Sequence, residues 1–467
     1  MTRQWFGTDG IRGRAEEGPL ATPFLVRLGR AVAEQALEEH GGSDPIQVLL
    51  GRDTRESGPA IVTSLAEGLS LGGMQVVDLG VLPTPGLPMA MRERGATRGV
   101  VVSASHNPWR DNGLKVFGAG GHKLTDEQEQ ALEARVEALG GEGESEVPAE
   151  LELGRVAPAP RVEDGALDYV RAMVERFDHV ELGGLKIAVD CAHGAASATA
   201  PFVLKELGAD LTVLCCHPNG RNINDECGST HLGLISKTAA EGRHHLGLAF
   251  DGDADRVLMV DSRGRTCTGD HMLGFLGRWF HGQGNLPGDT VVATVMSNLG
   301  LERMLSDRNI RLMRTAVGDR YVHACMREEG YGLGGEASGH LLFGAENDFT
   351  GDGLYTALRV LEGLVTTDTT LEDVVDAVPS IPQVLLNVPL KARPPIDRLP
   401  ALTARVREAE TAYGTDIRIV LRYSGTENLA RVMVEGLDAE LVKSLSDELA
   451  RMWEEQVKLH GPQGFSA

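Results

Sequence analysis

The sequence predicts an α/β protein with three related domains of mixed or largely parallel sheet and a smaller C-terminal α+β domain. Three observations support this prediction. A length of 467 residues suggests three or four domains. One arrangement of apolar runs and helical stretches occurs three times, and a change of composition precedes a different pattern near the C-terminus. With 42% hydrophobic and 24% charged residues, the composition is that of an ordinary globular protein.

Each repeat begins with an apolar strand, and these strands read "IQVLLGRD" from Ile46, "LKIAVDCAHG" from Leu185 and "DTVVATVMSN" from Asp289. A helical stretch and a second β-branched run follow, in the segments "GMQVVDLG", "GADLTVLCC" and "NIRLMRTAVG". Strands that alternate with helical periodicity predict βαβ units and largely parallel sheets.

The third strand of each repeat runs into a polar loop. The three segments are "GVVVSASHNP", "LGLAFDGDADR" and "GYGLGGEASGH". In sheets of this kind, ligands gather beyond the carboxyl ends of the strands. Each of the three loops is therefore a candidate site.

Two changes of composition divide the chain. The segment "GGEGESEVPAELELGRVAPAP" is typical of a linker, and a second change comes near "VPSIPQ" and "KARPPID". After it, "DIRIVLRYSGTENLARVMVEG" predicts two strands around a turn, and a helical stretch ends the pattern. We expect domains at residues 1–158, 159–258, 259–374 and 375–467.

The net charge of −22 and an aromatic content of 4% argue against binding to nucleic acid or to an anionic membrane surface. The start of the chain lacks the apolar run of a signal peptide, and no stretch is long enough to span a bilayer. Six cysteines without CxxC spacing are typical of reduced thiols. We expect a soluble cytoplasmic protein.

The loop "DGDADR" carries Asp251, Asp253 and Asp255, which repel one another unless a cation lies between them. An EF-hand is excluded, because Arg256 stands at the sixth position and Ser262 at the twelfth. Three carboxylates predict a Mg²⁺ site with room for a phosphate, and Arg256 suits a phosphate oxygen. A solvated acidic turn is the alternative.

The loop "SASHNP", residues 103–108, has the composition of a turn or helix cap. No G-x-S-x-G elbow is present, so a hydrolase triad is not indicated. The alternative is that Ser105 carries a phosphoryl group, which needs a cation to hold it. The aspartate loop would meet that need.

Two further loops offer groups for a sugar phosphate. "GEASGH", residues 335–340, combines a carboxylate, a hydroxyl and an imidazole that can bind sugar hydroxyls. "RYSGTEN", residues 422–428, combines a guanidinium and two hydroxyls with the free amides around Gly425, and these groups form a phosphate cradle. Arg431 could add a second guanidinium. A plain turn is the alternative for both loops, and no Walker A sequence is present.

Taken together, "GTDGIRG", "SASHNP" with "DNGLK", "DGDADR", "GEASGH" and "RYSGTE" resemble, in order and spacing, the motifs of the α-D-phosphohexomutases. The resemblance covers essentially the whole chain. It implies three related α/β domains and a smaller fourth around a central cleft. Within the family, "WFGTDGIRG", "TAVGDRYV" and "RVMVEG" resemble a bacterial branch that interconverts glucosamine 6-phosphate and glucosamine 1-phosphate for UDP-N-acetylglucosamine synthesis.

The resemblance also implies roles for individual residues. Ser105 would be the phosphoserine, and Asp251, Asp253 and Asp255 would hold one Mg²⁺ with a phosphoserine oxygen. The residues that would line the phosphoserine or transfer protons are Arg12, His106 and Lys115. The residues that would bind or select the sugar are Gly318, Asp319, Glu336, Ser338 and His340. The residues that would hold the phosphate that is not transferred are Arg422, Ser424, Gly425, Thr426 and Arg431.

A phosphoenzyme of this kind donates to one end of the sugar, lets a bisphosphorylated intermediate turn over, and takes a phosphate back from the other end. The resemblance further suggests a bisphosphorylated sugar activator and a homodimer. Three alternatives stay open at this point: a relative that prefers mannose or glucose phosphates, a Mg²⁺ phosphatase, and a sugar-phosphate sensor without activity. Departures from the family pattern, at Ala337 and Tyr423 among others, bear on the sugar.

Overall fold

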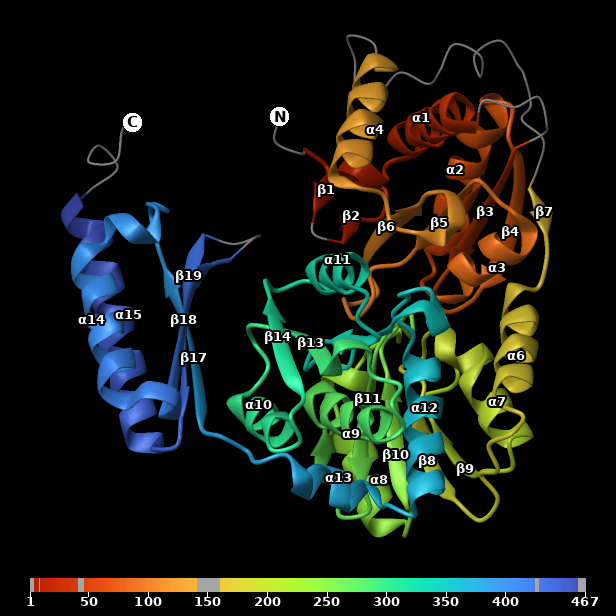
Figure 1. Cartoon of the computed structure of the whole chain (residues 1–467). Coiled ribbons are helices and arrows are strands. Elements are labelled where there is room, and N and C mark those ends of the chain that lie inside the picture. The colour runs from red at the N-terminus through yellow and green to blue at the C-terminus, as the bar shows by residue number, and fades with distance from the viewer. Residues whose placement is uncertain (1–3, 8, 41–45, 141–159, 425–427, 461–467) are drawn as a thin grey trace.

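The computed structural model describes residues 4–7, 9–40, 46–140, 160–424 and 428–460. These residues form four sheets with helices packed against them (Figure 1). The predicted fold class, three related α/β units and a smaller α+β domain, is confirmed. Residues 141–159, most of the predicted linker, lie outside the described residues.

The first sheet has seven strands in the order β1-β2-β6-β5-β3-β4-β7. Their bounds are β1 Phe6–Gly7, β2 Gly10–Arg14, β3 Gln47–Arg52, β4 Gln75–Val81, β5 Arg98–Val102, β6 Asp111–Phe117 and β7 Arg161–Val162. β3 is parallel to β4 and β5, whereas β6 is antiparallel to β5. The helices are α1 Thr22–His40, α2 Gly58–Leu71, α3 Gly86–Arg94 and α4 Asp126–Ala138.

The second and third sheets repeat this arrangement. The second has the order β12-β11-β10-β8-β9, with β8 Lys186–Asp190, β9 Asp210–Leu214, β10 Leu246–Phe250, β11 Val257–Asp261 and β12 Thr266–Cys267. The third has the order β14-β13-β15-β16, with β13 Thr290–Thr294, β14 Arg311–Thr315, β15 Leu333–Gly335 and β16 Leu341–Phe343.

Helices α7 to α13 pack against these two sheets, and α6 packs against α7 and against α3 and β4 of the first unit (Figure 1). Their bounds are α6 Gly165–Arg176, α7 Ala200–Glu206, α8 Gly233–Glu241, α9 Gly269–Gly282, α10 Leu299–Ser306, α11 Asp319–Glu329, α12 Gly353–Thr367 and α13 Leu371–Ala377.

In each of the three units the chain reverses after the third parallel strand. β5, β10 and β15 are followed by the antiparallel strands β6, β11 and β16. β5 and β10 are buried along their whole length, as expected for strands covered on both faces. The three polar loops are therefore the turns of three equivalent hairpins, each at the carboxyl end of a buried strand.

The C-terminal unit is a three-stranded antiparallel sheet in the order β17-β19-β18, covered by two helices. Its elements are β17 Gln383–Pro389, α14 Pro400–Tyr413, β18 Ile417–Tyr423, β19 Leu429–Gly436 and α15 Ala439–His460. Its core, built around the fully buried Trp453, is separate from the others. In Figure 1 this unit stands to one side of the rest of the molecule.

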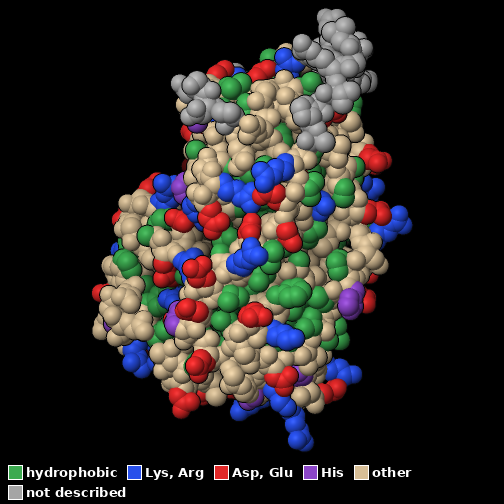
Figure 2. Space-filling model, turned by 90° about the vertical axis from the view of Figure 1, so that its right-hand side faces the viewer, with side chains coloured by type: hydrophobic (Ala, Val, Ile, Leu, Met, Phe, Trp, Pro, Cys, Tyr) green, Lys and Arg blue, Asp and Glu red, His purple; other side chains and the backbone are tan. Residues whose placement is uncertain are grey.

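The second and third units share a single hydrophobic core, which runs from Tyr169 to Val378 and includes α9 and α12. On the face drawn in Figure 2, acidic and basic side chains are interspersed. Within the described part of the chain, no helix combines the length and the apolar character needed to cross a membrane.

Candidate active site

Ser105 lies in the turn between β5 and β6, is almost fully buried, and adopts a left-handed backbone conformation with φ of 51°. Non-glycine residues adopt this conformation rarely, and it is frequent at functional sites. Ser105 Oγ donates a hydrogen bond of 2.6 Å to Asp251 Oδ2, and Nδ1 of His106 lies 3.3 Å from the same Oγ. The serine loop and the aspartate loop, 146 residues apart, are thus in direct contact.

Arg55 holds the serine loop in this conformation. Its side chain is fully buried and is paired with Asp53 at 2.8 Å. Its guanidinium donates to the backbone carbonyls of Ser105 (2.9 Å), Asn107 (2.8 Å), Asp111 (2.9 Å) and Pro108. Our sequence reasoning missed Arg55. Its only local signal is the polar stretch "RDTRES" directly after the first strand.

The three aspartates of the second hairpin are buried and close together. One carboxylate oxygen from each of Asp251, Asp253 and Asp255 lies within 4.8 Å of the others. The Nζ of Lys115, on β6, donates to Asp253 Oδ2 at 2.8 Å and to Asp255 Oδ2 at 2.9 Å. An ammonium group therefore balances part of the negative charge in this arrangement.

Burial and charge act in opposite directions on these groups. Burial raises the pKa of Asp251 well above its ordinary value, and the charges of Asp255 and Asp253 add to that effect. Burial also acts to raise the pKa of Asp255, but Lys115 and His340 together hold that pKa well below the ordinary value. For Lys115, burial lowers the pKa but the carboxylates raise it more, so the amine is protonated.

The aspartate triad fits a divalent cation. Oδ1 of Asp253 and Oδ1 of Asp255 are buried and have no hydrogen-bond partner among the described residues. Buried carboxylate oxygens without donors are costly unless a cation binds them. An all-oxygen donor set suits a hard ion rather than a soft one. The three carboxylates can therefore hold a metal ion.

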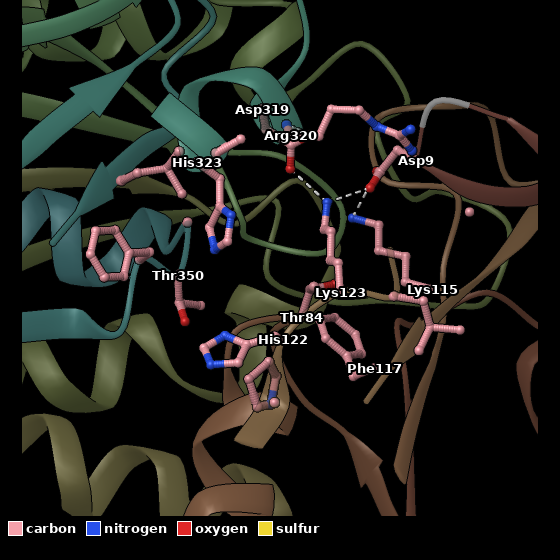
Figure 3. Close-up of a pocket in the computed structure, with 18 of the residues that line it drawn as sticks. Asp9, Thr84, Lys115, Phe117, His122, Lys123, Asp319, Arg320, His323 and Thr350 are labelled. Carbon is pink, nitrogen blue, oxygen red and sulfur yellow. Dashed lines mark hydrogen bonds and ion pairs between the residues drawn. The ribbon is translucent and has the colours of Figure 1, made fainter. Parts of the chain in front are cut away.

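Two residues that the sequence did not single out join the units around the triad. Thr84 Oγ1 donates to Asp253 Oδ2 at 2.5 Å. Lys123 Nζ lies 2.6 Å from Asp9 Oδ1 and 2.6 Å from Asp319 Oδ2, between the first and third units (Figure 3). The partners in each contact are far apart in the sequence, so no local sequence pattern predicts these contacts.

Two hollows meet at this point. A cavity of about 500 Å³ between the first and third units is lined by His122, Lys123 and His323 among others (Figure 3). A second, of about 360 Å³, brings together seven of the predicted site residues. These are Arg12, Asp255, Arg256, Gly318, Asp319, Glu336 and His340.

The third hairpin reaches the aspartate loop through His340. Its Nδ1 lies 3.7 Å from Asp255 Oδ1 and its Nε2 lies 3.7 Å from Asp319 Oδ2. Glu336 accepts a hydrogen bond of 3.1 Å from the amide of Gly318, which connects the sugar loop to the start of α11. Ser338 is exposed and is not among the residues that line the smaller hollow.

The predicted phosphate cradle lies in the C-terminal unit. Arg422 and Arg431 are direct cross-strand partners on β18 and β19, and Ser424 is buried. Burial and the charge of Arg431 lower the pKa of Arg422, and an anion would offset that repulsion. Gly425 and Thr426 lie outside the described residues. The cradle residues that the structure describes do not line either of the two hollows.

Comparison with known families gives four consecutive matches. The models described as phosphoglucomutase/phosphomannomutase, alpha/beta/alpha domains I, II and III, match residues 3–141, 167–264 and 268–381. The model of the C-terminal domain of the same family matches residues 385–452.

Individual proteins agree with this result. The chain is 43% identical over 452 residues to a phosphoglucosamine mutase of Anaeromyxobacter sp. (strain Fw109-5), covering 96% of this chain and 95% of the relative. It is 43% identical over 462 residues to a phosphoglucosamine mutase of Deinococcus radiodurans, covering 97% and 98%. The crystal structure of a phosphoglucomutase/phosphomannomutase family protein from Burkholderia thailandensis matches with a TM-score of 0.76 and 25% identity, covering 98% of each chain. The chain belongs to the phosphoglucomutase/phosphomannomutase family, the α-D-phosphohexomutases, as its motifs predicted.

Proposed function

We propose that this protein is a phosphoglucosamine mutase, which interconverts glucosamine 6-phosphate and glucosamine 1-phosphate and so feeds UDP-N-acetylglucosamine synthesis. The full-length similarity to relatives of that name supports the substrate. The observation that carries the chemistry is the 2.6 Å hydrogen bond between Ser105 Oγ and Asp251, within a buried triad of carboxylates. A phosphoryl group on Ser105 would lie beside the ion that those carboxylates can hold.

Ser105, as phosphoserine, is the phosphoryl carrier in this proposal. A sugar hydroxyl attacks the phosphorus, so that a new P–O bond to the sugar forms while the bond between phosphorus and Ser105 Oγ breaks. The product of this half-reaction is a bisphosphorylated sugar, which turns over before its other phosphate is returned to Ser105. Mg²⁺, one per chain on Asp251, Asp253 and Asp255, would supply neutralisation of charge on the phosphoryl oxygens.

Proton transfer falls to groups around the same loop. The sugar hydroxyl must lose a proton in one half-reaction and regain it in the reverse direction. Lys115, buried and hydrogen-bonded to two of the carboxylates, is the proposed acid and base. Arg12, His106 and Arg256 would hold the phosphoryl oxygens: His106 lies beside Ser105 Oγ, and Arg12 and Arg256 line the same hollow.

The remaining groups would orient the sugar. Glu336, His340 and Ser338 are proposed to bind its hydroxyls, and Gly318 and Asp319 at the start of α11 to select among sugars. The second phosphate would be held by the cradle of the C-terminal unit, which comprises Arg422, Ser424, Gly425, Thr426 and Arg431. The separation of the cradle from both hollows means that this unit must approach the rest of the molecule when substrate binds.

Substrate preference tests the proposal directly. The purified protein, with Mg²⁺ and a hexose bisphosphate activator, is incubated with the 6-phosphates of glucosamine, glucose and mannose in turn. We expect the highest kcat/KM for glucosamine 6-phosphate. A clear preference for mannose 6-phosphate would favour the phosphomannomutase/phosphoglucomutase alternative. Release of inorganic phosphate without isomerisation would favour a phosphatase.

Ser105→Ala tests the carrier. We expect loss of mutase activity to background with an unchanged thermal midpoint, because one loop hydroxyl contributes little to the core. Intact-protein mass spectrometry should find one added phosphate on the native chain, mapped to Ser105, and none on the variant. Near-normal turnover by the variant would exclude a phosphoserine mechanism.

The proposal extends to a cytoplasmic enzyme that acts as a homodimer on a free sugar phosphate. Family resemblance supports the dimer. Sedimentation equilibrium on the purified chain tests it, since a single species of 50.0 kDa would be the monomer.

A further inference from the structure

We propose that His193, Cys215 and Cys227 form a zinc site in the second unit, separate from the aspartate triad. The three residues come from three loops at one end of the sheet. His193 follows β8, Cys215 directly follows β9, and Cys227 directly precedes a short 3₁₀ turn at Gly228–Thr230. Their spacing gives no motif, which is why the sequence alone indicated only reduced thiols.

The donor atoms are already gathered. One ligand atom from each of the three residues lies within 4.8 Å of the others. Tetrahedral zinc, with bonds of ~2.3 Å to sulfur and ~2.0 Å to nitrogen, requires donor separations of roughly 3.5–3.8 Å. Contraction of the cluster by about 1 Å therefore suffices. Two thiolates and one imidazole are a donor set that selects zinc over magnesium, and they leave a fourth position for water.

The backbone around the cluster holds the ligands in uncommon conformations. His193 and Cys215 both have left-handed φ, at 49° and 46°. The amide of His193 donates to the carbonyl of Cys215 at 2.6 Å, and the amide of Asn224 donates to the carbonyl of Ala192 at 2.9 Å. Zinc binding would release the two thiol protons to solvent.

Asp190 supplies a second, independent observation. Its side chain is fully buried, and it accepts hydrogen bonds of 2.9 Å from the amides of Ala192 and Gly228 and a further one from the thiol of Cys215. Among the described residues, no lysine or arginine pairs with this carboxylate. A buried carboxylate without a fixed cation is what a neighbouring divalent ion would balance.

The loops that carry the cluster also contact the loops of Ser105 and of the three aspartates. Thr54 Oγ1 donates to the carbonyl of His193 at 2.6 Å, and the amide of Ala195 donates to the carbonyl of Gly252 in the aspartate loop at 2.8 Å. Asn224, three residues before Cys227, donates to the carbonyl of Ser105 at 2.9 Å. A zinc ion here would fix the three loops that support both Ser105 and the aspartates, which is a structural role.

Metal analysis of the full-length protein tests the site. The protein is purified under reducing conditions, freed of metal with a chelator, and titrated with Zn²⁺ at saturating Mg²⁺. We expect tight binding of one zinc per chain. With Co²⁺ in place of zinc, a near-ultraviolet thiolate-to-cobalt charge-transfer band should appear. Binding of no zinc by the unmodified protein would overturn the proposal without reference to any variant.

Variants locate the ion. His193→Asn and Cys215→Ser should each lower zinc affinity at least ~100-fold, because each removes a direct ligand. The matched controls are His231→Asn, an exposed histidine of the same unit, and Cys325→Ser, a thiol outside the cluster, and both should bind zinc normally. Undiminished affinity in His193→Asn, or a Cys215–Cys227 disulfide that persists in the metal-free protein under the reducing conditions of purification, would contradict a zinc site.

Discussion

Arg55 makes hydrogen bonds to four backbone carbonyls of the serine loop, although no motif contains it. It also pairs with the buried Asp53, and no other type of side chain has five donors in a rigid plane. Arg55→Lys would leave most of those carbonyls without a donor. We expect a loss of ~3–5 kcal/mol in the free energy of unfolding, measured by urea denaturation, because buried carbonyls that lose their donor cost about 1–3 kcal/mol each.

Activity should fall with stability in Arg55→Lys, since Ser105 would no longer be held at φ of 51°. The matched control is Arg221→Lys. Arg221 is largely exposed and pairs with Glu56 at 2.6 Å, so its substitution should change the free energy of unfolding far less than Arg55→Lys does. Equal stability losses in the two variants would contradict a special role for Arg55.

Asp352 gives the protein a pH-dependent stability away from the site. It caps α12 by accepting from the amide of Tyr355 at 3.0 Å, and it accepts from the hydroxyl of Tyr169 at 2.8 Å. Burial raises its pKa to about 6, above the ordinary 3.8. Between these two values the folded protein binds more protons than the unfolded chain, so stability falls as pH rises through this window. The full effect is about 3 kcal/mol.

Asp352→Asn removes this titration while keeping an oxygen for the helix cap. The unmodified protein loses stability as the pH rises from about 4 to about 6, and the variant does not. We therefore expect the stability of the variant, relative to that of the unmodified protein, to increase with pH across this range. The difference in thermal midpoint, followed across that range, checks it. A difference that stays constant with pH would show that Asp352 is not the group that titrates.

At the scale of single residues, the motifs located the hairpin turns because each turn concentrates polar residues after a buried strand. They could not locate Arg55, Thr84 or Lys123, whose roles depend on partners 50 to 196 residues away. The zinc ligands were missed for the same reason. The sequence does not show which loops lie close together, because the packing of the sheets determines the distances between loops.

At the scale of elements, the nine strands predicted for the three repeats are all present, because their apolar, β-branched runs favour strands both in the buried centre of a sheet, as in β5 and β10, and at its edge, as in β9 and β14. The sequence did not single out the antiparallel strands β6, β11 and β16, nor β17 in the C-terminal unit. These strands are antiparallel partners at the sides of the parallel core or in the small sheet. β6 nevertheless carries Lys115 into the aspartate triad.

The loop after β8 approaches the aspartate loop closely at Gly194, and a substitution there tests how the two loops pack. A Cβ at Gly194 would lie 2.3 Å from the carbonyl oxygen of Gly252, in the middle of the aspartate loop. Gly194→Ala should displace that loop and raise the Mg²⁺ concentration for half-maximal activity by roughly 10-fold or more. Gly183→Ala, in the same unit with nothing within 4 Å of the new Cβ, should leave it unchanged. The same Mg²⁺ dependence in both variants would contradict the steric argument.

At the scale of the whole molecule, the hydrophobic cores do not follow the boundaries between the sequence repeats. The second and third units share one core and should move as one body, whereas the C-terminal unit has its own. The domain boundaries expected from the sequence remain a prediction. The phosphate cradle belongs to the independent unit, and the phosphoryl site to the others. Binding of a substrate with a phosphate at each end therefore requires the contact between these bodies to be adjustable.

Arg418 is one of the polar links between the third unit and the C-terminal unit, beside the Arg303–Asp416 ion pair. It donates to the carbonyls of Val295 at 2.8 Å and Ser297 at 2.9 Å in the third unit, and it pairs with the fully buried Glu435. Arg418→Ala should free the C-terminal unit to sample more orientations. We expect a larger radius of gyration by small-angle X-ray scattering and, for a loss of ~1.4 kcal/mol in substrate binding, a roughly tenfold higher KM.

Phosphorylation of Ser105 should be unaffected in Arg418→Ala, because that residue lies in the other body. Arg405→Ala is the matched control, since it breaks an ion pair of 2.7 Å with Glu448 that lies wholly within the C-terminal unit. It should change neither the radius of gyration nor KM. Two results would contradict a role for Arg418 in the movement of the C-terminal unit: a changed phosphoserine content in Arg418→Ala, or an equal rise of KM in both variants. Arg418 would then contribute only to the stability of the fold.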